Sequence, residues 1–152
     1  MARNPTIGIE KVDHIGIRVA DAARAMKFYR VLGFAQPYRV PFDDVVIIRN
    51  GAGVEINLIV NANRPNRGRN ILMDVPGKYA GFTHVALRVK SVADTLRALK
   101  RARIRVTQGP VSFGDDGNVS VFVRDPDRNV IELRGRDEDA DGLGAKKYVP
   151  EN

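Results

Sequence analysis

The chain has two histidines, and both stand at the third position of nearly the same eight-residue stretch, "VDHIGIRV" at 12–19 and "FTHVALRV" at 82–89. An imidazole nitrogen can bind a divalent transition metal or move a proton near neutral pH. The two stretches are offset by 70 residues, from position 14 to position 84, and matched self-similarity of this kind indicates a duplicated unit. The aligned pairs are His14 with His84, Gly16 with Ala86, Arg18 with Arg88 and Val19 with Val89.

Strand alternation predicts which of these side chains meet, because successive side chains of a strand point to opposite faces. In each stretch the apolar residues share one face, which needs a covering helix. Each histidine shares the other face with a small residue and an arginine. The segments 54–60 and 130–135 read as strands with the same alternation, and they leave Glu55, Asn57 and Glu132 on the face of the histidines.

Two imidazoles and two carboxylates form a suitable site for one divalent transition metal, provided that the paired units turn these faces inward. The candidate ions are Zn²⁺, Ni²⁺, Mn²⁺, Fe²⁺ and Co²⁺, since the chain has no cysteine that would select zinc. A simpler interpretation places both histidines as ordinary core or surface residues, with Glu55 and Glu132 as solvated positions on an open sheet. The matched register of both residue types favours the metal site.

The elements that must position these residues also occur twice. Apolar residues at helical spacing predict helices over 20–34 and 91–104, with Asp21 and Ser91 as N-caps and Gly33 as a stop. Short strands are expected at 44–50 and 118–125, ahead of the two strands named above. The expected fold class is α+β, with two tandem βαβββ modules forming a cupped mixed sheet around a metal site.

Length and composition point to one domain over 1–152, since 43% of the residues are hydrophobic. We expect the first module over about 10–60, a linker over 61–81 and the second module over about 82–135. The remaining tail, 136–152, is polar and is expected to be loose unless a partner holds it.

The net charge of +7 raises the question of an anionic partner. The basic residues are scattered, without the clustered helix or interleaved aromatics of a nucleic-acid reader, so we expect a small-molecule substrate and no nucleic acid. No apolar run is long enough to span a bilayer and the N-terminus lacks the apolar core of a signal peptide, which predicts a cytoplasmic protein without a membrane partner.

Several of these stretches resemble the vicinal oxygen chelate superfamily, which includes glyoxalase I, extradiol dioxygenases, epimerases, and fosfomycin and bleomycin resistance proteins. The resemblance rests on the paired histidine strands, on "FYRVLGF" at 28–34 and most specifically on "FVRDPDRNVIEL" at 122–133. It covers roughly residues 10 to 135 and is closest to single-domain members of the glyoxalase I type. It implies that His14, His84 and Glu132 bind one metal.

The fourth metal position is open between two residues. Glyoxalase I-like members carry a carboxylate on the last strand of the first module, which favours Glu55. Aligning "INL" (56–58) with "IEL" (131–133) places Asn57 opposite Glu132 instead, and the site then has two histidines and one carboxylate, as in the dioxygenase and fosfomycin branches.

The resemblance implies a lyase or isomerase of the glyoxalase I type, which acts on a small anionic or thiol-conjugated substrate through an enediolate. Glu55 and Glu132 are then the candidates for proton transfer. The alternatives are an extradiol-type dioxygenase, a fosfomycin-type thiol transferase and a bleomycin-resistance-like binding protein without catalysis. Members of this size commonly build their sites in a homodimer, which we also expect here.

Substrate contacts are expected from inward-facing polar residues, Arg18, Arg88 and Asn57. The two arginines are placed to hold a substrate carboxylate, unless they only solubilise the rim of the cup. Inward residues of the middle strands should set selectivity, and the candidates are Val46, Ile48, Ser120 and Phe122.

Overall fold

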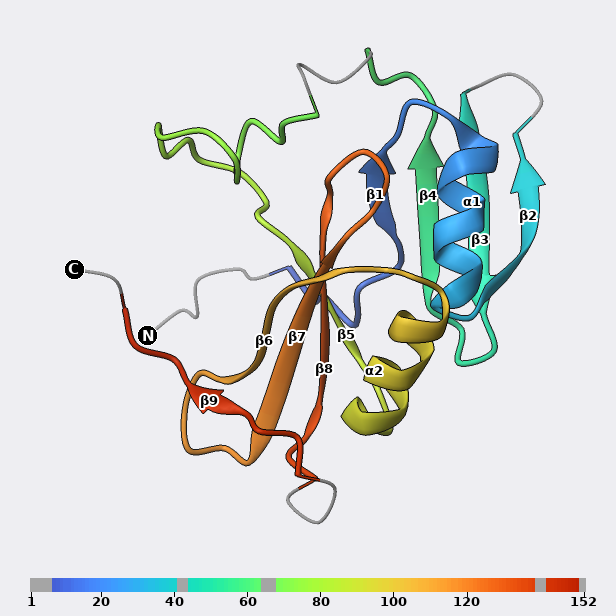
Figure 1. Ribbon diagram of the computed structural model, residues 1–152. Coiled ribbons are helices and arrows are strands. Elements are labelled where there is room, and N and C mark those ends of the chain that lie inside the picture. Colours follow the sequence, from blue (N-terminus) through green and yellow to red (C-terminus); the bar gives the residue numbers. More distant parts are fainter. Residues whose placement is uncertain (1–6, 41–43, 64–67, 139–141, 151–152) are drawn as a thin grey trace, which may run out of the picture.

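Two mixed β-sheets, each with one helix, make up the computed structural model of the chain, which describes residues 7–40, 44–63, 68–138 and 142–150 (Figure 1). The first sheet has the strand order β1-β4-β3-β2 and the second the order β5-β8-β7-β6-β9. The elements of the first half are β1 (Ile15–Arg18), α1 (Ala22–Val31), β2 (Phe34–Arg39), β3 (Val45–Asn50) and β4 (Glu55–Ile59). Those of the second are β5 (Val85–Arg88), α2 (Val92–Arg101), β6 (Val106–Ser112), β7 (Asn118–Arg124), β8 (Val130–Arg136) and β9 (Lys146–Lys147).

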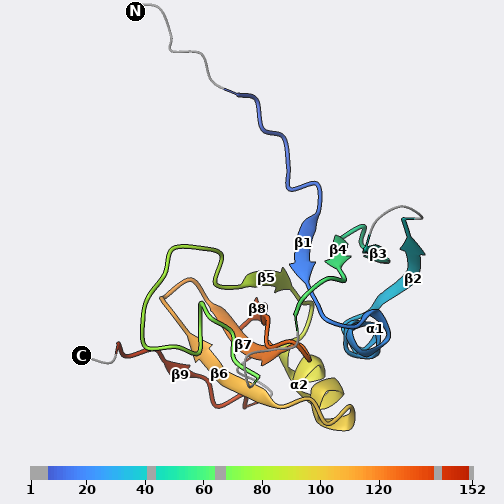
Figure 2. The same ribbon diagram turned by 90° about the horizontal axis from the view of Figure 1, so that it is seen from above.

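The strand pairing confirms the α+β fold of two βαβββ modules. In each module the first strand runs parallel to the last, β1 to β4 and β5 to β8, because the helix crosses between them. The remaining pairs along β4-β3-β2 and β8-β7-β6 are antiparallel. Figure 2 shows α1 and α2 next to each other on one side of the molecule, and β1 and β5 next to each other near its middle.

Both helices begin at the predicted caps. The Asp21 carboxylate accepts a hydrogen bond from the backbone N–H of Arg24, and the Ser91 hydroxyl accepts one from the N–H of Asp94. These bonds satisfy donors that the first helical turn leaves free. The first helix ends before Gly33, whose φ of +88° is the left-handed conformation that glycine adopts most easily.

The helix-facing sides of both sheets share one hydrophobic core. The predicted core faces are confirmed, since Ile17, Ile56, Leu58, Ile131 and Leu133 are all buried in it. Two residues predicted to face inward are in this core instead. Val46 and Ile48 lie directly opposite Leu58 and Ile56, and cross-strand partners project to the same face of a sheet, so that prediction is wrong.

The strands β2 and β6 carry prolines at irregular points of their pairing. Pro37 lies within β2, where the register with β3 shifts between Ala35 and Tyr38. Pro110 lies within β6, where the register with β7 shifts between Gln108 and Val111. A proline cannot donate to the ladder, so such strands fit at or near a sheet edge.

The tail is held more firmly than its composition predicts. Its short strand β9 runs parallel to β6, and the backbone N–H of Tyr148 donates to the Ser112 carbonyl. Earlier in the tail, the Glu138 carboxylate accepts hydrogen bonds from the backbone N–H of Val92 and from the Ser91 hydroxyl, at 2.8 and 3.0 Å. The tail thus covers one edge of the second sheet and caps α2.

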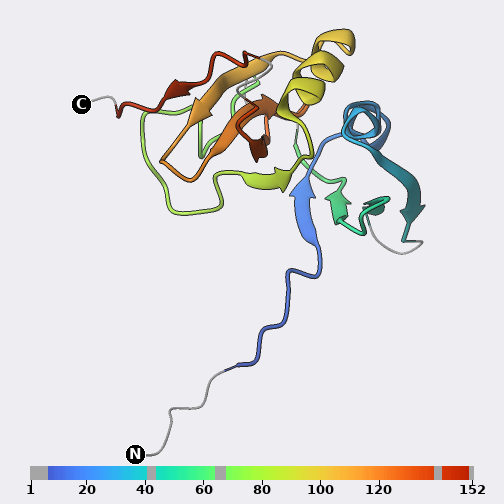
Figure 3. The same cartoon turned by 90° about the horizontal axis from the view of Figure 1, so that it is seen from below.

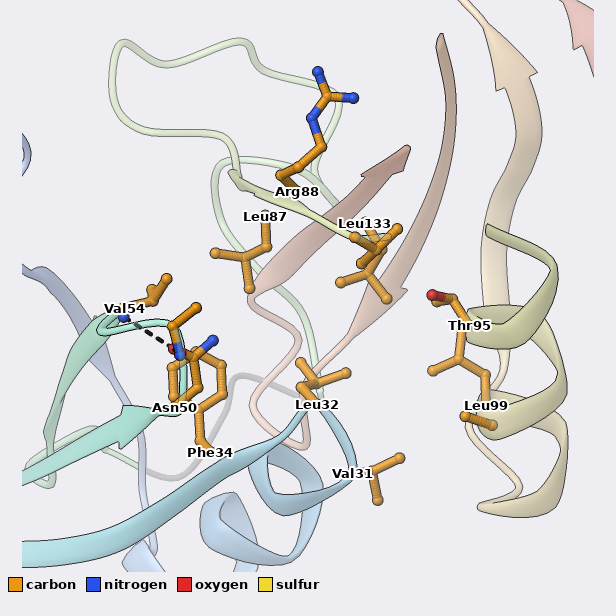
Figure 4. A pocket seen from close by; sticks show the side chains of 13 residues that line it. Val31, Leu32, Phe34, Asn50, Val54, Leu87, Arg88, Thr95, Leu99 and Leu133 are labelled. Carbon is orange, nitrogen blue, oxygen red and sulfur yellow. Dashed lines mark hydrogen bonds between the residues drawn. The ribbon is translucent and has the colours of Figure 1, made fainter. Parts of the chain in front are cut away.

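The turn between β7 and β8 joins the two modules. The Tyr29 hydroxyl of α1 donates to the buried Asp125 carboxylate at 3.0 Å, and the Asn129 amide donates to the Arg18 carbonyl. On the other side of the junction, Leu87 and Leu133 point toward Leu32 across an apolar cavity of about 420 Å³ (Figure 4). No helix in the described part of the chain is long and apolar enough to cross a membrane.

Candidate metal and substrate site

The strand register shows which residues of the two modules are equivalent. Gly16 lies opposite Asn57 in the first module, and Ala86 lies opposite Glu132 in the second. Since Gly16 and Ala86 follow their histidines by the same two residues, Asn57 is the positional equivalent of Glu132. Glu55 lies one side-chain repeat earlier on the same face of β4.

His84 and Glu132 are in direct contact on the face of the second sheet that points away from α2. The His84 Nε2 atom lies 3.0 Å from the Glu132 Oε2 atom. The Glu132 side chain is only 8% exposed, so it is not a solvated position on an open sheet. The Phe122 ring, directly across the ladder from Glu132, meets the imidazole edge to face at 5.8 Å.

A polar network orients the Glu132 carboxylate. The Ser120 hydroxyl donates to its Oε1 atom at 2.5 Å, and the Arg134 guanidinium donates to the Ser120 oxygen at 2.9 Å. Arg134 also pairs with Asp116. Arg134 was not among the residues predicted from the sequence, although its place two residues after Glu132 puts it on the same face of β8. A buried carboxylate held in this way has one oxygen fixed and the other directed at the histidine.

Arg88 belongs to the same face but reaches in another direction. Its guanidinium donates to the Asn118 side-chain oxygen at 2.6 Å. Arg88 and Arg134 lie opposite each other in the register of β5 and β8, so two guanidinium groups flank this end of the sheet. Guanidinium pairs of this kind suit a carboxylate or phosphate group.

The first module presents a more open face. The His14 Nδ1 atom lies 2.8 Å from the Asp13 carboxylate, and this contact lowers the pKa of the fully exposed Asp13. The Glu55 carboxylate forms an ion pair with Arg49 at 2.6 Å. The Asn57 side-chain oxygen is buried and has no hydrogen-bond partner among the described residues, which is a costly state for a polar atom.

A cavity of about 590 Å³ lies between β1 and β5, which run next to each other in Figure 3. It is lined by both histidines and by Arg18, together with apolar residues from the start of each module. Glu55 and Glu132 are not among its lining residues. The structure therefore brings His14 and His84 to one cavity but joins only His84 to a carboxylate of the predicted set.

These residues fit half of a metal site. A histidine nitrogen and a carboxylate oxygen at 3.0 Å can converge on one ion, and the fixed Glu132 orientation suits a ligand. Among the residues that the structure describes, no three His, Asp or Glu side chains are grouped closely enough to hold a metal. The four-ligand set of His14, Glu55, His84 and Glu132 stays a prediction.

Comparison with known proteins decides the family. The model of the Glyoxalase/Bleomycin resistance protein/Dioxygenase superfamily matches residues 11–133. The chain belongs to this superfamily. The match runs from just before the first histidine into β8, so it spans both modules and includes every predicted site residue of this superfamily member.

Individual relatives are distant. The virulence protein STM3117 of Salmonella typhimurium is 26% identical over 132 residues, which cover 82% of this chain and 83% of that protein. A glyoxalase/dioxygenase from Nostoc punctiforme has a similar structure, with a TM-score of 0.69 and 19% identity over 90% of this chain and all of that one. A lactoylglutathione lyase from Agrobacterium tumefaciens has a TM-score of 0.60 and 19% identity over 85% of this chain and 96% of that one. The two structures show the shared fold.

Proposed function

We propose that this superfamily member is a metal-dependent lyase or isomerase of the glyoxalase type, with a site that two copies of the chain complete. The observation that carries the proposal is the contact between His84 and the buried Glu132 carboxylate, with Ser120 fixing one carboxylate oxygen. A divalent transition metal bound there would stabilise negative charge on the oxygens of a substrate. The fold neighbour from Agrobacterium is a lactoylglutathione lyase, but at 19% identity it supports the fold rather than the reaction.

Glu132 is the residue placed to move a proton. The Ser120 O–H holds its Oε1 atom. The Oε2 atom, which faces His84, would serve as a metal ligand or, when it is not bound to the metal, as the base that takes a proton from one substrate carbon and returns it to the next. Burial of the carboxylate keeps water from competing for this proton. Arg88 and Arg134 would hold an anionic group of the substrate beside it.

The proposed completion of the site by a second copy is supported by polar groups on the described part of the first module that make no contact with the His84–Glu132 pair of the same chain. The orphaned Asn57 oxygen and the Glu55 carboxylate lie on a face of the first module that is only partly buried. A homodimer that brings this face against the His84–Glu132 pair of its partner would supply further ligands to the metal. His14, which projects into the cavity between β1 and β5, would belong to the same shared site.

One observation favours a second candidate function. Because the register makes Asn57, not Glu55, the equivalent of Glu132, this alternative gives the metal two histidines and one carboxylate as its protein ligands. Such a site keeps open positions for substrate and suits a ring-cleaving dioxygenase or a thiol transferase. The ion pair between Glu55 and Arg49 agrees with this alternative, since it occupies the Glu55 carboxylate.

Metal content of the untagged protein tests the proposal. We expect a stoichiometric divalent metal in the wild type after reloading, and its loss in His84→Ala and in Glu132→Gln. Asp94→Asn, an exposed carboxylate on α2, is the matched control and should keep the metal. Sedimentation of the loaded protein should show a dimer.

The remaining outcomes separate the candidates. Loss of the metal in Glu55→Ala but not in Asn57→Ala would support four ligands and the lyase or isomerase. Retention of the metal in Glu55→Ala would support three ligands and the alternative chemistry. A wild type that binds no metal after reloading would refute both, and a loaded monomer would refute the shared site.

A further inference from the structure

A second cavity, of about 500 Å³, lies where α1, the start of β6 and the β7–β8 turn meet, and it shares no lining residue with the cavity between β1 and β5. Four arginines line it, Arg103, Arg105, Arg124 and Arg128. We propose that it binds a small phosphate-bearing anion. This site is independent of the function proposed above.

The backbone at Arg103 is the first observation. Arg103 has a φ of +57°, a left-handed conformation that side chains with a Cβ rarely adopt. It follows the end of α2, where its N–H donates to the Lys100 carbonyl and the next N–H donates to the Leu99 carbonyl. This hydrogen-bond pattern ends many helices and normally has glycine at this position. The first module has Gly33 there, at the same 70-residue offset as the two histidines.

Arg128 also has a positive φ and stands where the first module has a glycine, here in the turn between β7 and β8. Its φ is +66°, and its N–H donates to the Asp125 carbonyl. In the first module the N–H of Gly53, with a φ of +82°, donates in the same way to the Asn50 carbonyl. The strand register gives this pair an offset of 75 residues, the offset that also relates Asn57 to Glu132.

At both positions the first module has a glycine and the second module has an arginine. Arg103 and Arg128 are the two non-glycine residues with positive φ in the described part of the chain, each replaces a glycine of the sister module, and both line one cavity. A non-glycine residue in this conformation strains the backbone. Retaining two such residues around one cavity indicates that their guanidinium groups are needed there.

The charges of the cavity are not balanced. Arg124 and Arg128 share the Asp74 carboxylate, at 3.1 and 2.7 Å. Arg103 and Arg105 form no ion pair or side-chain hydrogen bond with any described residue. Asp125 also lines the cavity, but its oxygens accept from the Tyr29 hydroxyl, the Asn129 amide and two backbone N–H groups of its own turn.

The chemistry of the lining defines the ligand. Guanidinium groups match the oxygens of a phosphate, and two of them without anionic partners favour a ligand with more than one negative charge. Phe28, Ile104 and Pro126 form an apolar side of the same cavity, which suits a small organic group attached to the phosphate. The volume lies within the range of small-molecule sites.

Titration of the full-length protein with inorganic pyrophosphate at low salt, followed by calorimetry and by amide chemical shifts, tests the proposal. We expect saturable binding with shifts around the cavity. Arg103→Gly and Arg105→Gln should each weaken it by about tenfold, the size expected for one charge-assisted contact. Arg39→Gln removes an equal charge at the end of β2 and should change the affinity by less than about twofold.

Arg103→Gly also separates binding from stability. Glycine relieves the backbone strain at this position, so the variant should unfold at the same temperature as the wild type or higher while it binds pyrophosphate more weakly. Absence of saturable binding, equal binding by Arg103→Gly, or equal weakening by Arg39→Gln would overturn the proposal. Tighter binding of a duplex oligonucleotide, weakened by the same variants, would also overturn it in favour of nucleic acid.

Discussion

The Asp74 carboxylate forms ion pairs with two arginines of the second module, and Asp74→Asn tests how much these ion pairs stabilise the protein. Its oxygens lie 3.1 Å from the Arg124 guanidinium and 2.7 Å from that of Arg128, and the side chain is 14% exposed. The backbone N–H of Asn70 donates to it as well. The hydrogen bond from Arg128 is the main cause that lowers the Asp74 pKa from 3.8 to about 2. Asparagine keeps the shape of the carboxyl group and removes its charge.

The lowered pKa sets the size and the pH range of the effect. A folded-state pKa below the unfolded one contributes stability above the unfolded pKa, and the contribution is lost as the pH falls through the folded pKa. The difference of about 1.8 pH units corresponds to about 2 kcal/mol at pH 7. The contribution should fall to about 1 kcal/mol at pH 3 and to less than about half of that at pH 2.

Urea unfolding of the wild type and of Asp74→Asn at pH 7, 4, 3 and 2 measures this difference directly. We expect the variant to be less stable at pH 7 and the two curves to converge between pH 4 and pH 2. An Asp94→Asn variant, which removes an exposed carboxylate paired with Arg97, should lose well under 1 kcal/mol at pH 7. If Asp74→Asn is as stable as the wild type at pH 7, or if it is as strongly destabilised at pH 2 as at pH 7, the ion pairs of Asp74 do not stabilise the protein in this way.

Two further substitutions probe the packing around the site. Tyr29→Phe removes the buried hydrogen bond to Asp125 and should lower the free energy of unfolding by about 1–2 kcal/mol. Burial already raises the pKa of the Asp125 carboxyl, and loss of the donor should raise that pKa further in an NMR titration. Gly135→Ala would place a Cβ atom 2.8 Å from the Val92 Cγ2 atom, and thermal unfolding should show a loss of about 1–3 kcal/mol. Wild-type stability of either variant would contradict the contacts described here.

Local features of the fold were predictable because the signals lie within a few residues. The caps Asp21 and Ser91, the stop at Gly33 and the apolar faces of the first and last strand of each module all follow from hydrogen bonding and side-chain periodicity along a short segment. The duplication was visible because the two histidine stretches match residue by residue.

Features that depend on pairing between segments were not predictable in the same way. The faces of β3 depend on its register with β4, and the sequence alone assigned Val46 and Ile48 to the wrong side. The parallel contact of β9 with β6 depends on where a polar tail returns in space. Local sequence does not specify either feature. A one-residue shift in register exchanges the two faces of a strand, so the face of each residue depends on the pairing with another segment.

In the candidate site, too, some residues could be predicted from the sequence and some contacts could not. The sequence selected His84 and Glu132, which lie 48 positions apart and meet at 3.0 Å because β5 and β8 are parallel neighbours. It did not select Arg134 or show that Ser120 orients the carboxylate, because those contacts cross between strands.

The two modules, their caps and core faces, and the residue types of the candidate site can be read from the sequence, since each depends on local spacing. The folded chain was needed to show that Asn57 is the equivalent of Glu132, that Glu55 pairs with Arg49, and that arginines far apart in the chain gather around one cavity. These contacts depend on strand register and module packing, which are set by the burial of whole faces. The position of a single polar side chain depends on how whole strands pack, and the residues next to it in the sequence do not specify it.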